Sequence, residues 1–256
     1  MKQLSKTTVL LVALSVMLAA LGAFCGAAYG MATDASFYVD DSRLAVARYL
    51  GREIGEDGLT ELDETAVTKY VGLTREEQTA FADETARQMG QANATFELEL
   101  LQAHEQQHMR DVRDLILLAD GVARASLTFA AILAIAAAWT GANLARRKRT
   151  GLLGALCGIG LLALIAGAFV LAMNTAGFER LFYGMHELLF TNRYWLLNPS
   201  TDILIRMMPQ PLFEMALVRL LADTGIRFAV VLAILAALYA IIGGMIRRNV
   251  TEREHA

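Results

Sequence analysis

Proline, cysteine and histidine are scarce in this sequence. Its 256 residues include three prolines, two cysteines and four histidines. Both cysteines, Cys25 and Cys157, lie within apolar stretches, so we interpret them as small packing residues rather than as a disulfide framework. The sequence also contains no internal repeat, no low-complexity tract and no glycine-rich phosphate loop. These absences argue against a disulfide-stabilised secreted domain, a repeat protein and a nucleotide-dependent enzyme.

Charged residues are missing from four long stretches. Each stretch has about 20 residues without Asp, Glu, Lys or Arg, which is the length that crosses roughly 30 Å of hydrocarbon as a helix. A charge at the membrane centre costs about 2.5–3.5 kcal/mol on the insertion scale, so four such runs predict a multi-pass membrane protein. The runs are Thr7–Ala32, Ser126–Ala145, Gly151–Asn174 and Phe228–Ile246.

The uneven distribution of charge predicts the orientation of these runs. Residues 34–120 contain 19 acidic and 8 basic residues. Basic residues instead flank the other ends of the runs, and the positive-inside rule places those ends in the cytoplasm. They are Lys2, Lys6, the sequence "RRKR" (146–149), Arg247, Arg248 and Arg253. The net charge of −3 therefore sums over two compartments and does not indicate a nucleic-acid partner.

Together these patterns predict an all-α fold: a four-transmembrane-helix bundle with both termini in the cytoplasm. We expect a single integral membrane domain over residues 1–256, with spans at 7–32, 126–145, 151–174 and 228–246. The first run is longer than the apolar region of a typical signal peptide, so we interpret it as a membrane anchor. Two extracytoplasmic helical segments, 33–125 and 175–227, connect the spans.

The two outer segments differ in character. In the first, residues 42–55 are amphipathic, and Thr74 with Glu77 has capping-box spacing. One or two helices are expected from there to residue 118, leading almost directly into the second span. The second outer segment contains all three prolines and many aromatic residues, among them Tyr183 and Trp195. It is too apolar for a water-facing loop, which favours an interfacial or re-entrant cap; the alternative is a set of packing helices that close the bundle.

Three of the four histidines fall in the outer segments. His104 and His108 form the sequence "HEQQH" (104–108), the H-E-x-x-H pattern in which two histidines on one helix face bind zinc and the glutamate acts as a base. His186 or Glu187 is the candidate third ligand. However, the surrounding helix is polar and no third-ligand motif follows. A membrane-anchored zinc metallopeptidase is therefore one alternative.

A second alternative uses His108 without a metal. Glu105 and Asp111 lie three residues on either side of His108, so on a helix they share its face. A carboxylate on the second ring nitrogen would fix the imidazole tautomer and raise its basicity, as a general base requires. His186 would then be a partner base or an oxyanion donor. The remaining alternative is a solvated charged face in a non-enzymatic lipid-binding or partner-binding membrane protein.

Two motifs together resemble the lipoprotein intramolecular transacylase family, often called Lit. The first is Glu105-x-x-His108-Met109-x-Asp111-Val112, and the second lies in "FYGMHELLFTNRYWLLNPSTDILIRMMPQPLF". His104 is not part of the first motif. The four-span layout with two outer segments is also similar to that of the family. The family-like positions of the second motif are His186, Phe190, Asn192, Trp195, Pro199, Asp202, Ile205, Pro209 and Phe213.

This resemblance implies a cofactor-free acyl transfer in a bacterial cell membrane, with the active site on the extracytoplasmic face. The substrate would be a diacylated lipoprotein, whose sn-2 acyl chain moves to the α-amino group of its N-terminal cysteine and leaves a lyso-form lipoprotein. His108 would act as the base and His186 at the oxyanion or leaving oxygen, or the reverse. The implied substrate-binding residues are Asn192, Trp195, Asp202, Tyr183 and Phe190, with membrane lipid around the aromatic cap.

Overall fold

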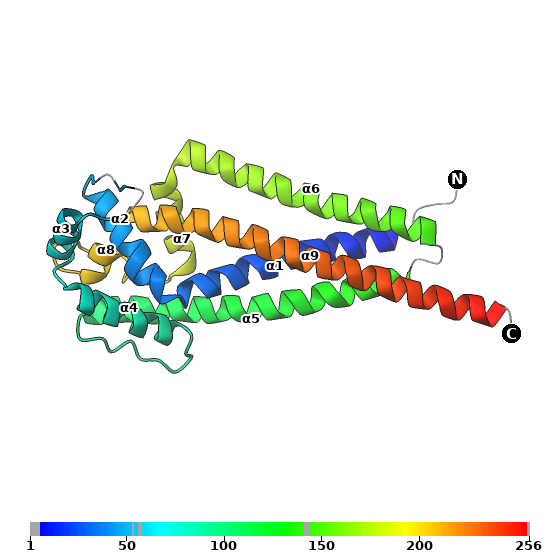
Figure 1. Ribbon diagram of the computed structural model, residues 1–256, viewed down its shortest axis with the longest axis horizontal. Coiled ribbons are helices and arrows are strands. Elements are labelled where there is room, and N and C mark those ends of the chain that lie inside the picture. Colours follow the sequence, from blue (N-terminus) through cyan, green and yellow to red (C-terminus); the bar gives the residue numbers. More distant parts are fainter. Residues whose placement is uncertain (1–5, 53, 56–57, 141–143, 255–256) are drawn as a thin grey trace. The chain divides into compact units, whose positions relative to one another are not determined.

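The computed structural model describes residues 6–52, 54–55, 58–140 and 144–254, and helices dominate it (Figure 1). The described residues contain no β-strand beyond an isolated bridge between Gly55 and Gly58. The elements, in chain order, are α1 (Lys6–Ala32), the π-helix η1 (Phe37–Asp41), α2 (Ser42–Tyr49), α3 (Glu61–Val71), α4 (Arg75–Met89), α5 (Ala103–Trp139), α6 (Leu144–Ala176), α7 (Phe178–Leu189), α8 (Ile203–Met207) and α9 (Gln210–Glu254).

Four of the described helices, α1, α5, α6 and α9, are long and apolar enough to cross a membrane. Helices α1, α6 and α9 each contain one whole charge-free run, so the predicted all-helical fold with four candidate spans is confirmed. Helix α5 contains only residues 126–139 of the second run, because the helix ends at Trp139, six residues before the predicted end of that span. Residues 141–143 of the second run, and Lys2 before the first, lie outside the described residues. The cytoplasmic location of the termini and the single-domain organisation stay predictions.

Contacts divide the chain into two compact units. Unit 1 comprises Met1–Ala27, Gly121–Asn174 and Asp223–Ala256, and unit 2 comprises Ala28–Asp120 and Thr175–Ala222. In unit 1 small residues allow close helix contact, as is typical of membrane helices. The Ser15 hydroxyl donates a hydrogen bond to the Ala130 carbonyl at 2.7 Å. A Cβ at Gly154 would come within 2.8 Å of the Val12 side chain, so α6 can approach α1 here only with glycine.

In unit 2 capping boxes define the starts of α3 and α4. The Thr74 side chain accepts from the Glu77 backbone while Glu77 accepts from the Thr74 backbone, as the spacing predicted. Thr60 and Asp63 form the same reciprocal pair at the start of α3. Helix α3 was not predicted, because the region was interpreted only as polar and glycine-containing. The pair Thr60 and Asp63 is the signal that would have located it.

The chain between α4 and α5 is mostly exposed but inserts the side chain of Phe96 into the core. Phe96 is fully buried and has a positive φ of 53°, which is unusual for a bulky residue. The Gln88 side chain accepts a hydrogen bond from the Phe96 backbone N–H at 2.7 Å. Arg110 donates to the Thr95 carbonyl at 2.7 Å, and Arg113 donates to the Ala94 carbonyl. These contacts place this segment against α5, so two helices rather than one lead toward the second span.

The second outer segment begins with α7. A stretch without regular secondary structure follows, and α8 then leads into α9. The Arg219 guanidinium on α9 pairs with Asp34 and with Asp41, the latter at 2.5 Å. The Ser42 hydroxyl donates to the Met207 carbonyl of α8. The two outer segments therefore form one packed unit, whose core includes Phe37, Tyr38, Val46, Val67, Phe81, Met89, Phe96, Met207 and Leu212.

Candidate active site

Two histidines from different outer segments meet in unit 2. His108 lies on α5 and His186 on α7, and their ring centroids are 6.0 Å apart with an interplanar angle of 37°. Both side chains are buried, with 8% and 7% relative exposure. Neither histidine forms an ion pair with a carboxylate among the described residues. The structure thus brings together the two imidazoles that the sequence singled out. Burial lowers the pKa of His108 to about 4, and the charge of Asp111 opposes this only in part.

Aromatic rings surround this pair. The Phe190 ring lies 5.2 Å from His108 and 5.5 Å from His186. The rings of Phe182 and Trp195 lie 4.2 Å and 5.1 Å from His186. Phe190 and Trp195 were predicted site residues, whereas Phe182 was not. Such an environment has a low dielectric constant and disfavours the charged form of an imidazole.

The tautomer of His186 follows from its hydrogen bond. Its Nδ1 lies 2.8 Å from the carbonyl oxygen of Phe182, one helical turn earlier. Because a carbonyl can only accept, Nδ1 carries the proton and Nε2 presents a lone pair. Burial lowers the pKa of His186, and the Phe182 carbonyl raises it only in part. His186 is therefore a neutral imidazole with a free basic nitrogen.

His108 has a different arrangement. Its Nδ1 is buried and has no hydrogen-bond partner among the described residues. A proton on Nδ1 would leave a buried donor without an acceptor, and unsatisfied buried donors are rarer in proteins than unsatisfied buried acceptors. The favoured tautomer of His108 therefore keeps the lone pair on Nδ1 and the proton on Nε2. In that form His108 is a hydrogen-bond donor.

The structure does not place a carboxylate on the second nitrogen of His108, contrary to our expectation. Asp111 instead accepts from Gln107 Nε2 at 2.7 Å and from Asn192 Nδ2 at 2.8 Å. The backbone carbonyl of Asn192 in turn accepts from the Trp195 indole N–H at 3.0 Å. Through these bonds Asp111 holds the segment that carries Trp195 against His186, and its charge also raises the pKa of His108 against the larger lowering by burial.

Glu105 also lies away from the histidine ring. It is fully buried, and its two carboxylate oxygens accept from the backbone N–H groups of Gln102 and Leu204, each at 2.8 Å. The first bond caps the start of α5, and the second holds α8 against it. The spacing to His108 suggested a shared helix face, but buried backbone N–H groups offered Glu105 better partners.

His104, the first histidine of the "HEQQH" pattern, contacts Asp202 rather than a ligand shared with His108. His104 Nε2 lies 3.0 Å from an Asp202 oxygen that also accepts from the Asn198 backbone N–H. Burial raises the pKa of Asp202, but hydrogen bonds from Asn198, His104 and Thr201 together hold that pKa below its usual range. Among the described residues no group of three or more His, Cys, Asp or Glu side chains could hold a metal ion.

Tyr183 stands at the edge of the aromatic cluster. Its ring lies 5.7 Å from Trp195 and 6.3 Å from Phe182, and 45% of the residue is exposed. It contacts the residues around His186 rather than either histidine. Asp202 accepts hydrogen bonds within the 198–202 turn and contacts His104 on α5. Among the described residues, neither of these two predicted substrate-binding residues has a hydrogen bond or ring contact with His108 or His186.

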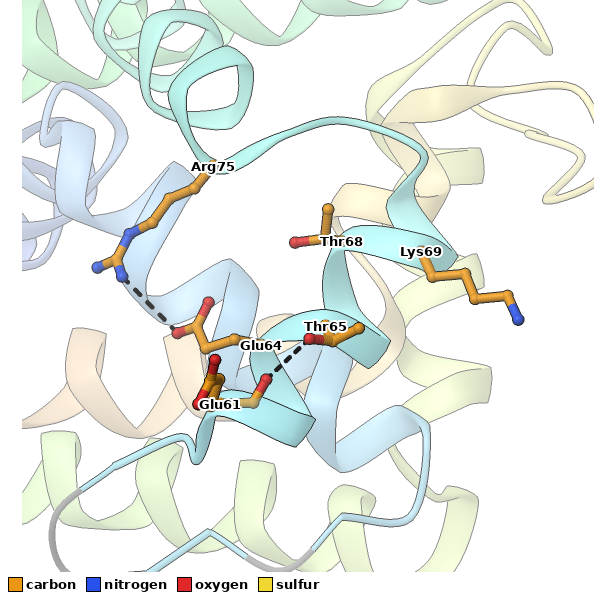
Figure 2. Close-up of a pocket in the computed structure, with 6 residues that line it drawn as sticks. All are labelled: Glu61, Glu64, Thr65, Thr68, Lys69 and Arg75. Atoms are coloured by element: carbon orange, nitrogen blue, oxygen red, sulfur yellow. Dashed lines mark hydrogen bonds and ion pairs between the residues drawn. The ribbon is translucent and has the colours of Figure 1, made fainter.

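Another surface depression lies between α3 and the start of α4. It has a volume of about 660 Å³ and is lined by the residues drawn in Figure 2. Glu64 and Arg75 face each other there at 4.0 Å, while Lys69 extends away from them. Its lining contains neither a histidine nor a cysteine. We therefore assign the candidate active site to the buried histidine pair.

Fold and site together define a class: a multi-pass helical membrane protein with a buried pair of histidines in its outer segments. Residues 59–213, more than half of the chain, match the family model of the lipoprotein intramolecular transacylase Lit. The chain belongs to the Lit family. Its resemblance to that family, predicted from two motifs, is confirmed. The family name denotes a transacylase, and hence an enzyme, that modifies lipoproteins.

Solved structures show the same fold. The in meso structure of the membrane integral lipoprotein intramolecular transacylase Lit from Bacillus cereus is similar over 97% of each chain, with a TM-score of 0.59 and 18% identity. Two variants of that protein, with a histidine replaced by arginine or alanine, give TM-scores of 0.59 and 0.57 at 20% identity. They cover 94% of this chain and 93% and 94% of their own. No curated protein matches the sequence significantly.

Proposed function

We propose that this protein moves the sn-2 acyl chain of a diacylglyceryl lipoprotein to the α-amino group of the lipoprotein's N-terminal cysteine. The observation that carries this proposal is the buried pair of His186 and His108, 6.0 Å apart between ring centroids. At that separation both rings can reach groups on a single tetrahedral centre. The pair offers one basic nitrogen and one donor, which is the minimum that an aminolysis of an ester requires.

His186 is the proposed base, although the sequence had favoured His108 and left the reverse open. The α-ammonium group has an ordinary pKa of roughly 7.7–8.0, well above that of a buried histidine. The amine must therefore enter the site neutral. As its nitrogen bonds to the ester carbonyl carbon, the N–H becomes strongly acidic, and His186 Nε2 accepts that proton.

His108 is the proposed oxyanion donor. While the N–C bond forms, the carbonyl oxygen gains negative charge and the His108 Nε2–H can donate to it in a site that excludes water. The intermediate then collapses: the bond between the carbonyl carbon and the glyceryl oxygen breaks, and that oxygen receives the proton held by His186. The products are an N-acyl cysteine and a lyso-glyceryl group, and no proton is gained or lost.

Positioning supplies the rest of the acceleration. Amine and ester belong to the same lipid-modified cysteine, and well-oriented intramolecular reactions reach effective molarities on the order of 10⁵–10⁸ M. The Asp111–Asn192 contact fixes Trp195 beside His186, and Phe190 covers both rings. An amide is more stable than an ester, so the transfer needs no cofactor. The charge distribution supports an extracytoplasmic site, where lipoproteins and membrane lipid are both present.

The test is expression in a bacterial host whose lipoproteins stay diacylated with a free amine. Mass spectrometry of N-terminal lipopeptides should then show one acyl chain on nitrogen and one on the glyceryl group. His186→Ala and His108→Ala, each inserted in the membrane at normal levels, should remove this product. Unchanged product from either variant would exclude that histidine from the mechanism.

A further inference from the structure

A second cavity of unit 2 lies beside the histidine site. It has a volume of about 180 Å³ and a wall built largely of aromatic rings. These rings come from three parts of the chain: Tyr49 and Tyr70 from the first outer segment, Phe178, Phe182 and Tyr183 from α7, and Phe213 from α9. The rest of the lining consists of Pro199, Ile205, Pro209, Gln210 and the charged residue Glu179. The cavity is therefore suited to an apolar ligand.

Phe182 forms the boundary between this cavity and His186. Its ring lines the cavity, lies 4.2 Å from the His186 ring and lies 4.9 Å from Phe213, the next aromatic ring of the lining. A group attached to a carbonyl beside His186 would thus reach the cavity by passing one aromatic ring. The two spaces are neighbours in the same unit, although none of the cavity's lining residues is a histidine.

The tyrosines contribute mainly ring carbon atoms to the cavity. Tyr49 and Tyr70 have ring centroids 5.5 Å apart. Besides the tyrosine hydroxyls, the polar groups of the lining belong to Glu179 and Gln210, and Gln210 Nε2 donates to Glu214 at 2.8 Å. An alkyl chain would bury its surface against the aromatic carbon atoms, which favours it over a peptide or a sugar.

We infer that this cavity binds the first methylenes of the migrating acyl chain. The inference rests on the proposed function and adds to it a binding site with a limited capacity. A volume of 180 Å³ corresponds to about six water molecules, so only the part of a long chain nearest the carbonyl fits. Each methylene that enters should raise kcat/KM about fourfold, and methylenes beyond the cavity should add little.

The experiment uses purified full-length protein and synthetic diacylglyceryl cysteinyl lipopeptides. The sn-1 chain is kept at sixteen carbons, roughly the membrane-anchoring length, while the sn-2 chain is lengthened stepwise. For the unaltered protein kcat/KM should rise about fourfold per methylene and then reach a plateau. Ile205→Trp, which fills the cavity, should move the plateau to shorter chains, and Ile205→Ala should move it to longer ones.

Leu62→Trp is the matched control, because Leu62 lies on α3, is 68% exposed and does not line the cavity. Its profile should equal that of the unaltered protein. Should Ile205→Trp not fold, Ile205→Ala alone still tests the direction of the shift. The inference is overturned if folded Ile205 variants keep the original plateau, or if the unaltered protein shows no dependence on chain length. Absence of any transfer by the unaltered protein would instead overturn the proposed function itself.

Discussion

The carboxylate of Glu105 accepts a hydrogen bond from the backbone N–H of Leu204 at 2.8 Å, across 99 positions of sequence. Its second oxygen accepts from Gln102, the residue before α5. Glu105 is fully buried, so both bonds form in a low dielectric. This residue thus joins α5, which carries His108, to α8.

Glu105→Gln should lower stability more than it lowers the rate of transfer. The amide leaves one of the two backbone N–H groups facing a donor, at a cost of about 1–3 kcal/mol. Thermal unfolding in detergent measures the change. At a temperature where the variant is folded, transfer should stay within a few-fold of the unaltered rate. A large loss of transfer without a loss of stability would return Glu105 to the chemical step.

Glutamine substitutions should separate the roles of the two histidines. Glutamine keeps an N–H near the position of Nε2 but offers no base, so His108→Gln should retain more transfer than His108→Ala. His186→Gln should be as inactive as His186→Ala, with a loss of about 10²–10⁴ in rate. Loss of the oxyanion donor in His108→Ala should cost about 10²–10³. The reverse pattern, measured by single-turnover lipopeptide assays, would exchange the two assignments.

The pH dependence of transfer should follow the substrate amine. Burial lowers the pKa of His186, so this imidazole stays neutral and basic at and below its ordinary value of about 6.5. The ammonium group, with a pKa of roughly 7.7–8.0, therefore limits kcat/KM as pH falls. The rate should drop about tenfold per pH unit below that value, with a further decline from His186 only at lower pH.

A lipopeptide with a less basic α-amine provides the control for this profile. Its break should move to lower pH by the difference between the two amine pKa values. A break near 6.5 or above that is the same for both substrates would show that an enzyme group controls the profile, and would contradict the neutral-amine mechanism.

Exchanging Asp111 and Asn192 tests their role in positioning. Asp111→Asn leaves two amides facing each other, and hydrogen bonds to charged groups contribute about 1.5–3 kcal/mol, so transfer should fall by roughly ten- to a hundredfold. The double variant Asp111→Asn with Asn192→Asp restores one donor and one acceptor. It should recover a large part of the rate if the contact only positions Trp195. No recovery, with fluorescence showing Trp195 in its original environment, would argue for a direct action of Asp111.

Transfer should survive chelating agents, and the purified protein should not require zinc. His104 contacts Asp202 at 3.0 Å, and the 104/108 pair has no third ligand among the described residues. His104→Ala should therefore lower stability modestly and leave the chemical step in place. Elemental analysis decides between the two functions: stoichiometric zinc that disappears in His104→Ala would support the peptidase alternative.

Several features of the fold were predictable because their causes are local. A run without charges requires only its own residues to indicate a span. Three of the four runs lie wholly in long helices, and the second lies in α5 up to Trp139. Thr74 and Glu77 likewise define a helix start by contacting each other three residues apart. Helix α3 was missed although Thr60 and Asp63 carry the same signal, because aspartate at the third position is a less familiar form of the capping box.

Within the site, the sequence identified residues better than it identified their contacts. Helical spacing placed Glu105 and Asp111 beside His108, yet both carboxylates bind elsewhere. Backbone N–H groups at the ends of α5 and α8, and the amide of Asn192, satisfy them more fully than a single ring nitrogen would. Spacing along one helix specifies which residues share a face, but not which groups another segment brings to that face.

The amino-acid sequence alone determined the helical class, the four apolar spans and the family. Each of these depends on patterns within short stretches of sequence, or on the order of such stretches along the chain. The packing of the outer segments decided the rest: that His186 meets His108, that the Phe182 carbonyl leaves His186 with a free Nε2, and that an aromatic cavity adjoins it. Those properties depend on atoms that are distant along the chain. Only folding, which buries these atoms together away from water, sets their protonation and their partners.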